Sequence, residues 1–287
     1  MLDYVYLDTT LGSTLLHQTG ASRGLTDASG LIGIPGIRGD SYDLPDDDGA
    51  REPAAQHVTS NVFSVSGMIR GNPLEVAWLD WDVVAASIIA CKDVLGTMRW
   101  QRVGGGAQRS RRVKLAGSLE PPLVVGAQVI SYQATFRSPD PCAYGASTNS
   151  ATIDPTIGAL GGMTIPLVFP LDLGGGSSGG LTLSNAGNYP SRRVAYTLTG
   201  PWVSPSVTNS TTGKGITSTV SLAAAETLVV DCDARTVLYQ GVDASGTITW
   251  RTSRWPVLGK GGNVIVAGGF PSAGSQLAVT YLDAYIS

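Results

Sequence analysis

The chain has little charge, few histidines and few cysteines. Only 14% of its 287 residues are charged, 2 are His, and the 3 cysteines, Cys91, Cys142 and Cys232, are far apart in the sequence. An odd number of separated cysteines predicts neither a disulfide framework nor a zinc site. The net charge of -3 argues against a general nucleic-acid binder. Such low charge is typical of a Ser/Thr-rich β surface or of one covered by partner chains, and both interpretations stay open.

Long apolar runs are missing as well. No stretch of apolar residues is long enough for a transmembrane helix, so we expect no membrane insertion. The first residues, Met1 to Asp8, have neither a basic segment nor an apolar one, so we expect no signal peptide and assembly in a cytoplasm.

Catalytic and metal-binding motifs are a third absence. The pattern G-x-S-x-G occurs at 20–24 and 176–180, but neither copy stands between a strand and a helix, as a nucleophile elbow requires. The acidic turn 43–49 lacks the carboxylate that would follow the glycine of an EF-hand loop. We therefore predict no catalytic, cofactor-binding or metal site, no cofactor and no enzymatic activity. The remaining classes of function are assembly with other proteins and molecular recognition.

What is present is β structure with one helix. Residues 62–70 alternate between apolar and polar positions, as in a half-buried strand. Asn72 and Pro73 then predict a helix start, and apolar residues at helical spacing extend the helix over about 73–94. Residues 97–103 and 109–116 predict a hairpin around Gly104–Gly106, and short strand candidates fill the second half. The predicted fold class is mainly β.

A proline-rich seam divides the chain. The strand that ends in Phe136 and Arg137 runs into Ser-Pro-Asp-Pro at 138–141. We predict an N-terminal β-rich domain, 1–145, with one amphipathic helix, and a C-terminal β-sandwich domain, 146–287. The Gly/Ser run at 174–180 is interpreted as a long loop.

Two charged clusters and three tryptophans are the candidate sites. Basic residues gather at Arg99, Arg102, Arg109, Arg111 and Arg112, and acidic ones at Asp46, Asp47 and Asp48. The clusters are either solvated loops, a complementary pair between subunits, or a basic lining of a channel. The tryptophans, which could stack on sugars or lie in the core, are Trp202, Trp250 and Trp255.

The order of these features resembles the distal tail protein family of siphophages. The resemblance rests on Gly36-Ile37-Arg38-Gly39-Asp40 with the acidic turn, and on Gly67-Met68-Ile69-Arg70-Gly71 before the helix. It rests further on the seam with Tyr144, on Asn185-Ala186-Gly187-Asn188-Tyr189-Pro190-Ser191, and on Gly261-Gly262-Asn263 before a final strand. The Gly-rich run at 174–180 departs from the family pattern.

The resemblance implies a virion protein at the tail tip. The chain would form a ring with itself, commonly a hexamer, through its N-terminal domains, with galectin-like sandwiches outside. The ring would join the tail tube protein to a tail-tip hub protein, with DNA only passing through the channel. Receptor-binding proteins and host glycans are open as further partners. A carbohydrate-binding module and a tail tube subunit are the alternatives.

Overall fold

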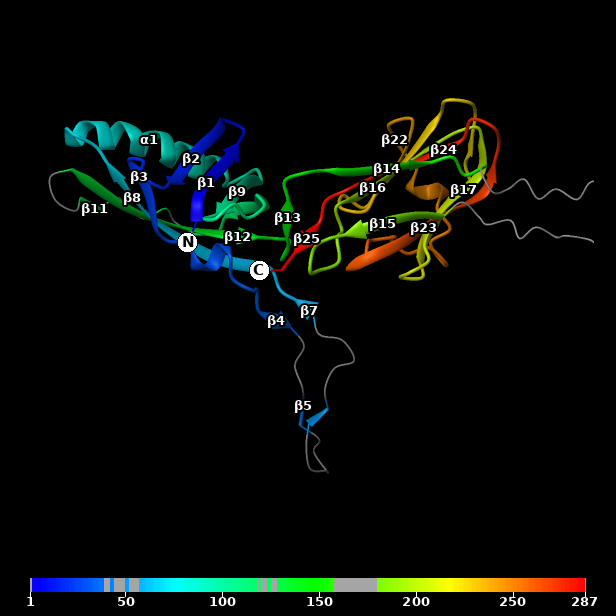
Figure 1. Ribbon diagram of the computed structural model, residues 1–287, viewed down its shortest axis with the longest axis horizontal. Coiled ribbons are helices and arrows are strands. Elements are labelled where there is room, and N and C mark those ends of the chain that lie inside the picture. Colours follow the sequence, from blue (N-terminus) through cyan, green and yellow to red (C-terminus); the bar gives the residue numbers. More distant parts are fainter. Residues whose placement is uncertain are drawn as a thin grey trace, which may run out of the picture. The chain divides into compact units, whose positions relative to one another are not determined.

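The computed structural model describes residues 2–38, 42–43, 50–51, 57–117, 119, 123–124, 128–156 and 180–286. The chain divides into two compact units, one of Met1–Ala146 with Ile286–Ser287 and one of Ser147–Tyr285. Strands make up most of both units, and the described residues contain a single α-helix, α1 (Figure 1). The mainly β fold is confirmed. That 1–145 and 146–287 fold independently stays a prediction.

One curled antiparallel sheet forms the first unit. Its strand order is β2-β1-β9-β10-β12-β8-β3, with β11 beside β12 and β13 beside β10. The sheet bends at β10, which pairs with β9 through Arg109–Val113 and with β12 through Lys114 and Leu115. The main strands are β1 (Leu2–Thr9), β2 (Gly12–Gln18), β3 (Arg23–Asp27), β8 (Asn61–Arg70), β9 (Gly96–Arg102), β10 (Arg109–Leu115) and β12 (Val129–Ser138).

Shorter elements extend from this sheet. Two small ladders, β4 with β7 and β5 with β6, lie in the segment between β3 and β8 (Figure 1). The short elements are the 3-10 turn Ser29–Leu31 and the strands β4 (Ile37–Arg38), β5 (Tyr42–Asp43), β6 (Ala50–Arg51), β7 (His57–Val58), β11 (Leu123–Val124) and β13 (Ala143–Gly145).

The alternation predicted for residues 62–70 is confirmed in β8. Phe63, Val65 and Ile69 point into the core, where Phe63 packs on Phe136 of β12 with ring centroids 6.1 Å apart. β8 and β12 pair along their whole length, from Asn61 opposite Ser138 to Arg70 opposite Val129. Because side chains alternate on a strand, this register sends one apolar row of each strand into the same core.

Side chains, not a backbone ladder, join β2 to β3. The Arg23 guanidinium of β3 donates to the Leu15 carbonyl of β2 at 3.0 Å. It also forms a two-point ion pair with Asp80 of α1, at 3.2 Å from Nε and 3.0 Å from Nη2. The backbone N–H of Leu25 donates to His17 of β2 at 3.1 Å. These contacts hold β2 and β3, the first and last strands of the sheet, next to each other.

Helix α1 (Leu74–Ala90) packs against β1, β2, β8 and β12. Its buried face carries Ala77, Trp81, Val84 and Ile88, as the helical spacing predicts. Trp81 lies against Tyr132 with ring centroids 5.5 Å apart. Trp78, which the spacing also assigns to this stripe, is instead on the outer face and partly exposed.

The predicted ends of the helix are wrong. The N-cap is Pro73, not Asn72, and no side chain caps the first turn. At the other end α1 stops at Ala90 and not near residue 94. There the Cys91 carbonyl accepts from the Leu115 N–H of β10 at 3.0 Å, so the chain is drawn onto the sheet and continues as β9.

Two antiparallel sheets form the second unit. One has the order β14-β24-β16-β20-β21-β22, and the other has β15-β23-β17-β18 with β19 beside β17. Apolar side chains from both sheets share one core, for example Tyr196 and Val279 from the first and Val207 and Ile265 from the second. The β-sandwich is therefore confirmed.

The strands of this unit are short, apart from β17 and β23. They are β14 (Asn149–Ile153), β15 (Gly180–Asn185), β16 (Val194–Thr199), β17 (Trp202–Asn209), β18 (Lys214–Thr217), β19 (Ser221–Leu222), β20 (Thr227–Asp231), β21 (Thr236–Tyr239), β22 (Val242–Asp243), β23 (Gly261–Pro271), β24 (Gln276–Tyr281) and β25 (Ala284–Tyr285). A 3-10 turn covers Ser245–Thr247.

Three buried asparagines hold the loops of the sandwich. The Asn185 amide donates to the carbonyls of Tyr189 and Gly259, at 2.8 and 3.1 Å. Asn209 donates to Asn263 at 3.0 Å, and Asn263 donates to Gly259 and accepts from its N–H. Because each amide both donates and accepts, these buried polar groups are satisfied and fix the loops that they join.

Gly187 shows how close this packing is. A Cβ at Gly187 would collide with the backbone carbonyl of Ala284. We predict that Gly187→Ala lowers the free energy of unfolding by about 2–3 kcal/mol, since backbone atoms cannot move aside cheaply. Thermal or chemical denaturation measures the change. Gly262→Ala is the matched control, because a Cβ there meets nothing within 4 Å. Equal stability of the two variants would contradict the prediction.

Candidate functional site

Arg99, a predicted interface residue, is neutralised within its own subunit. Its guanidinium on β9 forms a two-point ion pair with Asp8 of β1, in which Nη2 lies 2.7 Å from Oδ1. It also lies over the ring of Tyr6, 5.5 Å from the centroid. Burial opposes ionisation of Asp8, but hydrogen bonds from Arg99 and Ser13 outweigh it and lower the pKa of the carboxyl below its usual value. Arg99 therefore ties β9 to β1.

Arg111 is a correction to the predicted site. Its side chain is fully buried, 5.9 Å from the ring centroid of Trp100, and Nη2 donates to the Pro141 carbonyl at 3.3 Å. Burial lowers the pKa of the guanidinium, against the attraction of Cys142 and Asp140. Nε and Nη1 have no hydrogen-bond partner among the described residues. A side chain buried inside the subunit cannot line a channel or reach a neighbour.

The other basic candidates lie on the surface of the β9–β10 hairpin. Arg102 ends β9 and Arg112 lies on β10, and both are exposed, while Arg109 begins β10 and is half-buried. The predicted hairpin is confirmed by the pairing of Arg109 opposite Trp100. The acidic candidates Asp46, Asp47 and Asp48 lie outside the described residues, as does nearly all of the 174–180 run.

The seam is fixed by Asp140. Its carboxylate accepts from the Tyr144 hydroxyl at 2.6 Å and from the Cys142 N–H at 3.0 Å. The Ser138 hydroxyl donates to the Asp140 carbonyl at 2.6 Å. Arg111, described above, contacts the same turn. The sequence indicated the seam through its prolines, and the spacing of Asp140 and Tyr144 is the signal that could have predicted this bond.

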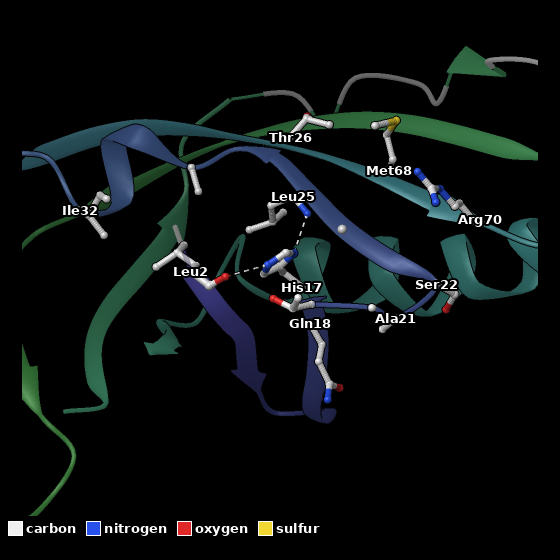
Figure 2. A pocket seen from close by; sticks show the side chains of 14 residues that line it. Leu2, His17, Gln18, Ala21, Ser22, Leu25, Thr26, Ile32, Met68 and Arg70 are labelled. Atoms are coloured by element: carbon white, nitrogen blue, oxygen red, sulfur yellow. Dashed lines mark hydrogen bonds between the residues drawn. The ribbon is translucent and has the colours of Figure 1, made fainter. Parts of the chain in front are cut away.

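A pocket of about 610 Å³ opens beside the β2–β3 junction (Figure 2). Its apolar residues include Leu2, Leu25, Ile32 and Met68, and Arg70 lies among its polar ones. Strands whose backbones do not pair leave space between them, and here that space is the pocket. Sequence analysis missed it, because no motif marks a gap between two strands.

His17 crosses this junction, and its two hydrogen bonds fit one tautomer of the imidazole. Its Nδ1 accepts the Leu25 N–H at 3.1 Å, so Nδ1 carries no proton. Nε2 lies 3.1 Å from the Leu2 carbonyl and must therefore be the protonated nitrogen that donates to it. Figure 2 shows both bonds. Since both ring nitrogens are occupied, His17 is a connector of β1, β2 and β3 and not a general base.

The three candidate tryptophans are in different environments. Trp202 is buried in the core, where its Nε1 donates to the Gly268 carbonyl at 3.0 Å, so it cannot stack on a sugar. Trp250 is 43% exposed, and its ring centroid lies 5.6 Å from that of Trp255. Of the three candidate tryptophans, Trp250 together with Trp255 is the pair that offers an aromatic surface.

Reactive and metal-binding groups are scarce in the part of the chain that the structure describes. No three His, Cys, Asp or Glu side chains in it come together as a metal site. All three cysteines are buried and none is in a disulfide, and burial raises the pKa of Cys91 to about 11. No helix in the described ranges is long and apolar enough to span a membrane.

Comparison with known proteins gives a family match in the second unit. Residues 186–285 match the family model of the siphovirus-type tail component, C-terminal domain. The C-terminal unit is similar to siphovirus-type tail components. The resemblance predicted from the sequence is thereby confirmed, and the matched residues begin directly after the buried Asn185. No curated protein matches the chain.

Solved structures match the fold over nearly the whole chain. One is the crystal structure of the SPP1 Dit protein (gp 19.1), described as a paradigm of hub adsorption apparatus in Gram-positive infecting phages. It matches with a TM-score of 0.60 at 11% identity, over 97% of this chain and 98% of that one. A chain of the phage P2 baseplate in its activated conformation with Ca matches with a TM-score of 0.53 at 11% identity, over 98% of both chains. The same baseplate with Sr gives 0.53 at 12% identity, over 97% of both.

We predict that His17→Ala destabilises the protein by about 1–3 kcal/mol, because the Leu25 N–H and the Leu2 carbonyl both lose their partner. Urea denaturation measures the loss. Gln18→Ala, the exposed neighbour that lines the same pocket, is the control and should change stability little. A His17 variant as stable as the Gln18 variant would show that the imidazole does not hold the junction.

Proposed function

We propose that this protein is a structural component of a phage tail tip, forming a ring-shaped hub that joins the tail tube to the host-adsorption apparatus. The observation that carries the proposal is the agreement of two comparisons. A family model of siphovirus tail components matches the second unit, and the fold of the SPP1 Dit protein matches 97% of the chain. The protein is accordingly located in the virion, at the tail.

The proposed assembly is a closed ring, commonly a hexamer, formed by the first unit. The matched structures are described as a hub adsorption apparatus and a baseplate, which supports an assembled state. A head-to-tail contact closes into a ring when its rotation permits. The proposed neighbours are the tail tube protein and a tail-tip hub protein, with DNA only passing through the channel. Receptor-binding proteins are further candidate partners.

The proposed role is structural and not catalytic. At the pocket, the ring nitrogens of His17 are both engaged with the backbone, which leaves the imidazole without the lone pair that a base needs. The basic hairpin instead supports a role in assembly. We propose that Arg102, Arg109 and Arg112 face a neighbouring subunit or the channel, with Asp46, Asp47 and Asp48 as one candidate set of partners.

The purified full-length protein should form a discrete ring. We expect mass photometry to give one oligomer, with six copies as the expected number, and electron microscopy to show closed rings. A tail tube subunit would instead give open tubes of variable length. The neighbouring tail proteins are added in a second experiment, because a ring can need a template to close. A monomer in both experiments would contradict the proposal.

Glycan binding by the second unit is a second candidate function. The partly exposed Trp250 beside Trp255 favours it, since an aromatic face can stack on a sugar ring.

If the second unit binds glycans, a glycan array should detect binding that Trp250→Ala abolishes. Phe270→Ala is the control, because Phe270 is also a large exposed aromatic side chain of this unit. Equal loss in both variants, or no binding by the wild type, would contradict the sugar-binding role.

A further inference from the structure

Helix α1 is apolar on the side that faces away from the sheet. Besides its buried stripe, it exposes Val76, Leu79, Val83 and Ile89, and Leu79 is 68% exposed. A surface helix of a globular protein normally turns a polar face to solvent. A helix that is apolar all round is typical of a buried position, so we infer that a partner covers this face. We call the exposed residues Glu75, Val76, Trp78, Leu79, Asp82, Val83 and Ile89 the α1 face.

The charge within the α1 face is acidic. Glu75 and Asp82 are both exposed, and seven residues of helix separate them by about 10 Å along the axis. The only other acidic residue of α1, Asp80, is paired with Arg23 inside the subunit. A partner that covers the α1 face must therefore supply apolar surface together with positive charge.

This requirement argues against two α1 faces packing on each other. A symmetric pair would bring two copies of Glu75 and two of Asp82 together on apolar surface. Like charges at an interface cost free energy unless each finds an opposite partner. The contact is therefore between different surfaces, which is the head-to-tail arrangement that generates rings.

The tip of the β9–β10 hairpin has the complementary chemistry. Arg102 and Arg109 flank the tip, and Val103 between them is 54% exposed. Gly104 and Gly105 have φ of 94° and 81°, and a Cβ at either would meet nothing within 4 Å. A tip of glycines lets the backbone approach a partner closely. The hairpin tip thus presents an apolar side chain beside the exposed Arg102, with the half-buried Arg109 across the tip at the start of β10.

The packing of α1 favours a contact between copies. Helix α1 packs against β1, β2, β8 and β12, and β9 and β10 are not among these main neighbours. The α1 face is the exposed side of the helix, whereas the β9–β10 hairpin is part of the sheet on which the opposite side of the helix packs.

We propose that the α1 face of one copy binds the β9–β10 hairpin tip of the next copy. Val103 packs among the apolar residues of the helix, and Arg102 and Arg109 meet Glu75 and Asp82. The inference rests on the proposed ring and identifies the two surfaces that close it.

A charge-reversal cycle on the full-length protein tests the contact. We expect Glu75→Lys with Asp82→Lys, or Arg102→Glu with Arg109→Glu, to raise the concentration of half-assembly about tenfold at low salt. Combining all four changes should restore assembly, because the charges are exchanged and not removed. Asp3→Lys with Asp93→Lys is the matched control. It changes the net charge of the same unit by the same amount, at exposed positions outside the α1 face, and should assemble like the wild type.

Circular dichroism melting separates misfolding from lost assembly, and Leu79→Ser tests the apolar part without any change of charge. If the wild type forms rings and both α1 variants assemble like the control, the inference is wrong and the ring proposal stands. If the hairpin variant is rescued by reversing Asp46, Asp47 and Asp48 to Lys but not by reversing Glu75 and Asp82, the acidic loop is the partner and the inference is wrong. If the wild type forms no ring even with the neighbouring tail proteins added, the proposed function fails and the inference with it.

Discussion

The N-terminal unit depends on side chains that close the gap between β2 and β3. The sheet order ends at these two strands, and no backbone ladder joins them. Arg23 connects β3 to the Leu15 carbonyl of β2 and to Asp80 of α1, while His17 connects the Leu25 N–H to the Leu2 carbonyl. Arg23 and His17 therefore hold the two end strands of the curled sheet side by side, next to the pocket. Arg23 also attaches helix α1 to this end of the sheet. A half-buried junction of this kind is sensitive to loss of either partner, because backbone groups left without their hydrogen bond are only partly compensated by water.

Helix α1, which the Arg23–Asp80 ion pair attaches to β3, has a different role on each of its two sides. Its inner stripe, with Trp81 against Tyr132, completes the core of the subunit. Its outer side is also apolar and leaves Leu79 and Val83 in solvent. In an isolated subunit this exposure costs free energy, and covering it returns about 25 cal/mol for each Å² of apolar surface removed from water. Assembly is then favoured by the same physical effect that folds the subunit, and charge decides which surfaces meet.

Much of the fold could be predicted from local sequence patterns. The environments of the candidate site residues could be predicted less well. The alternation in β8, the hairpin around Gly104 and the β-sandwich were predictable, since strand periodicity and turn glycines are local signals. The helix ends were not, because the Cys91 carbonyl is drawn to β10 by a contact that no local pattern contains. Arg111 was misjudged for a related reason, whereas for Trp202 the core was already one of the two alternatives. A run of basic residues on a strand alternates between faces, so Arg112 is exposed while Arg111 enters the core beside Trp100. No local pattern indicates the role of His17, since that role needs three strands to be in place.

The buried asparagines of the sandwich limit how far such a sequence can diverge. The side-chain amides of Asn209 and Asn263 are hydrogen-bonded to each other, and each also binds backbone groups of the adjoining loops. Aspartate has the same shape but cannot donate, so it would break the network and bury a charge. Positions of this kind tolerate almost no chemical change, whereas the core strands need only apolar side chains of suitable volume. A lineage could therefore replace most of its residues and keep the architecture, provided that a few amides stay. The SPP1 Dit protein has a similar fold at 11% identity, so this architecture is compatible with very different sequences.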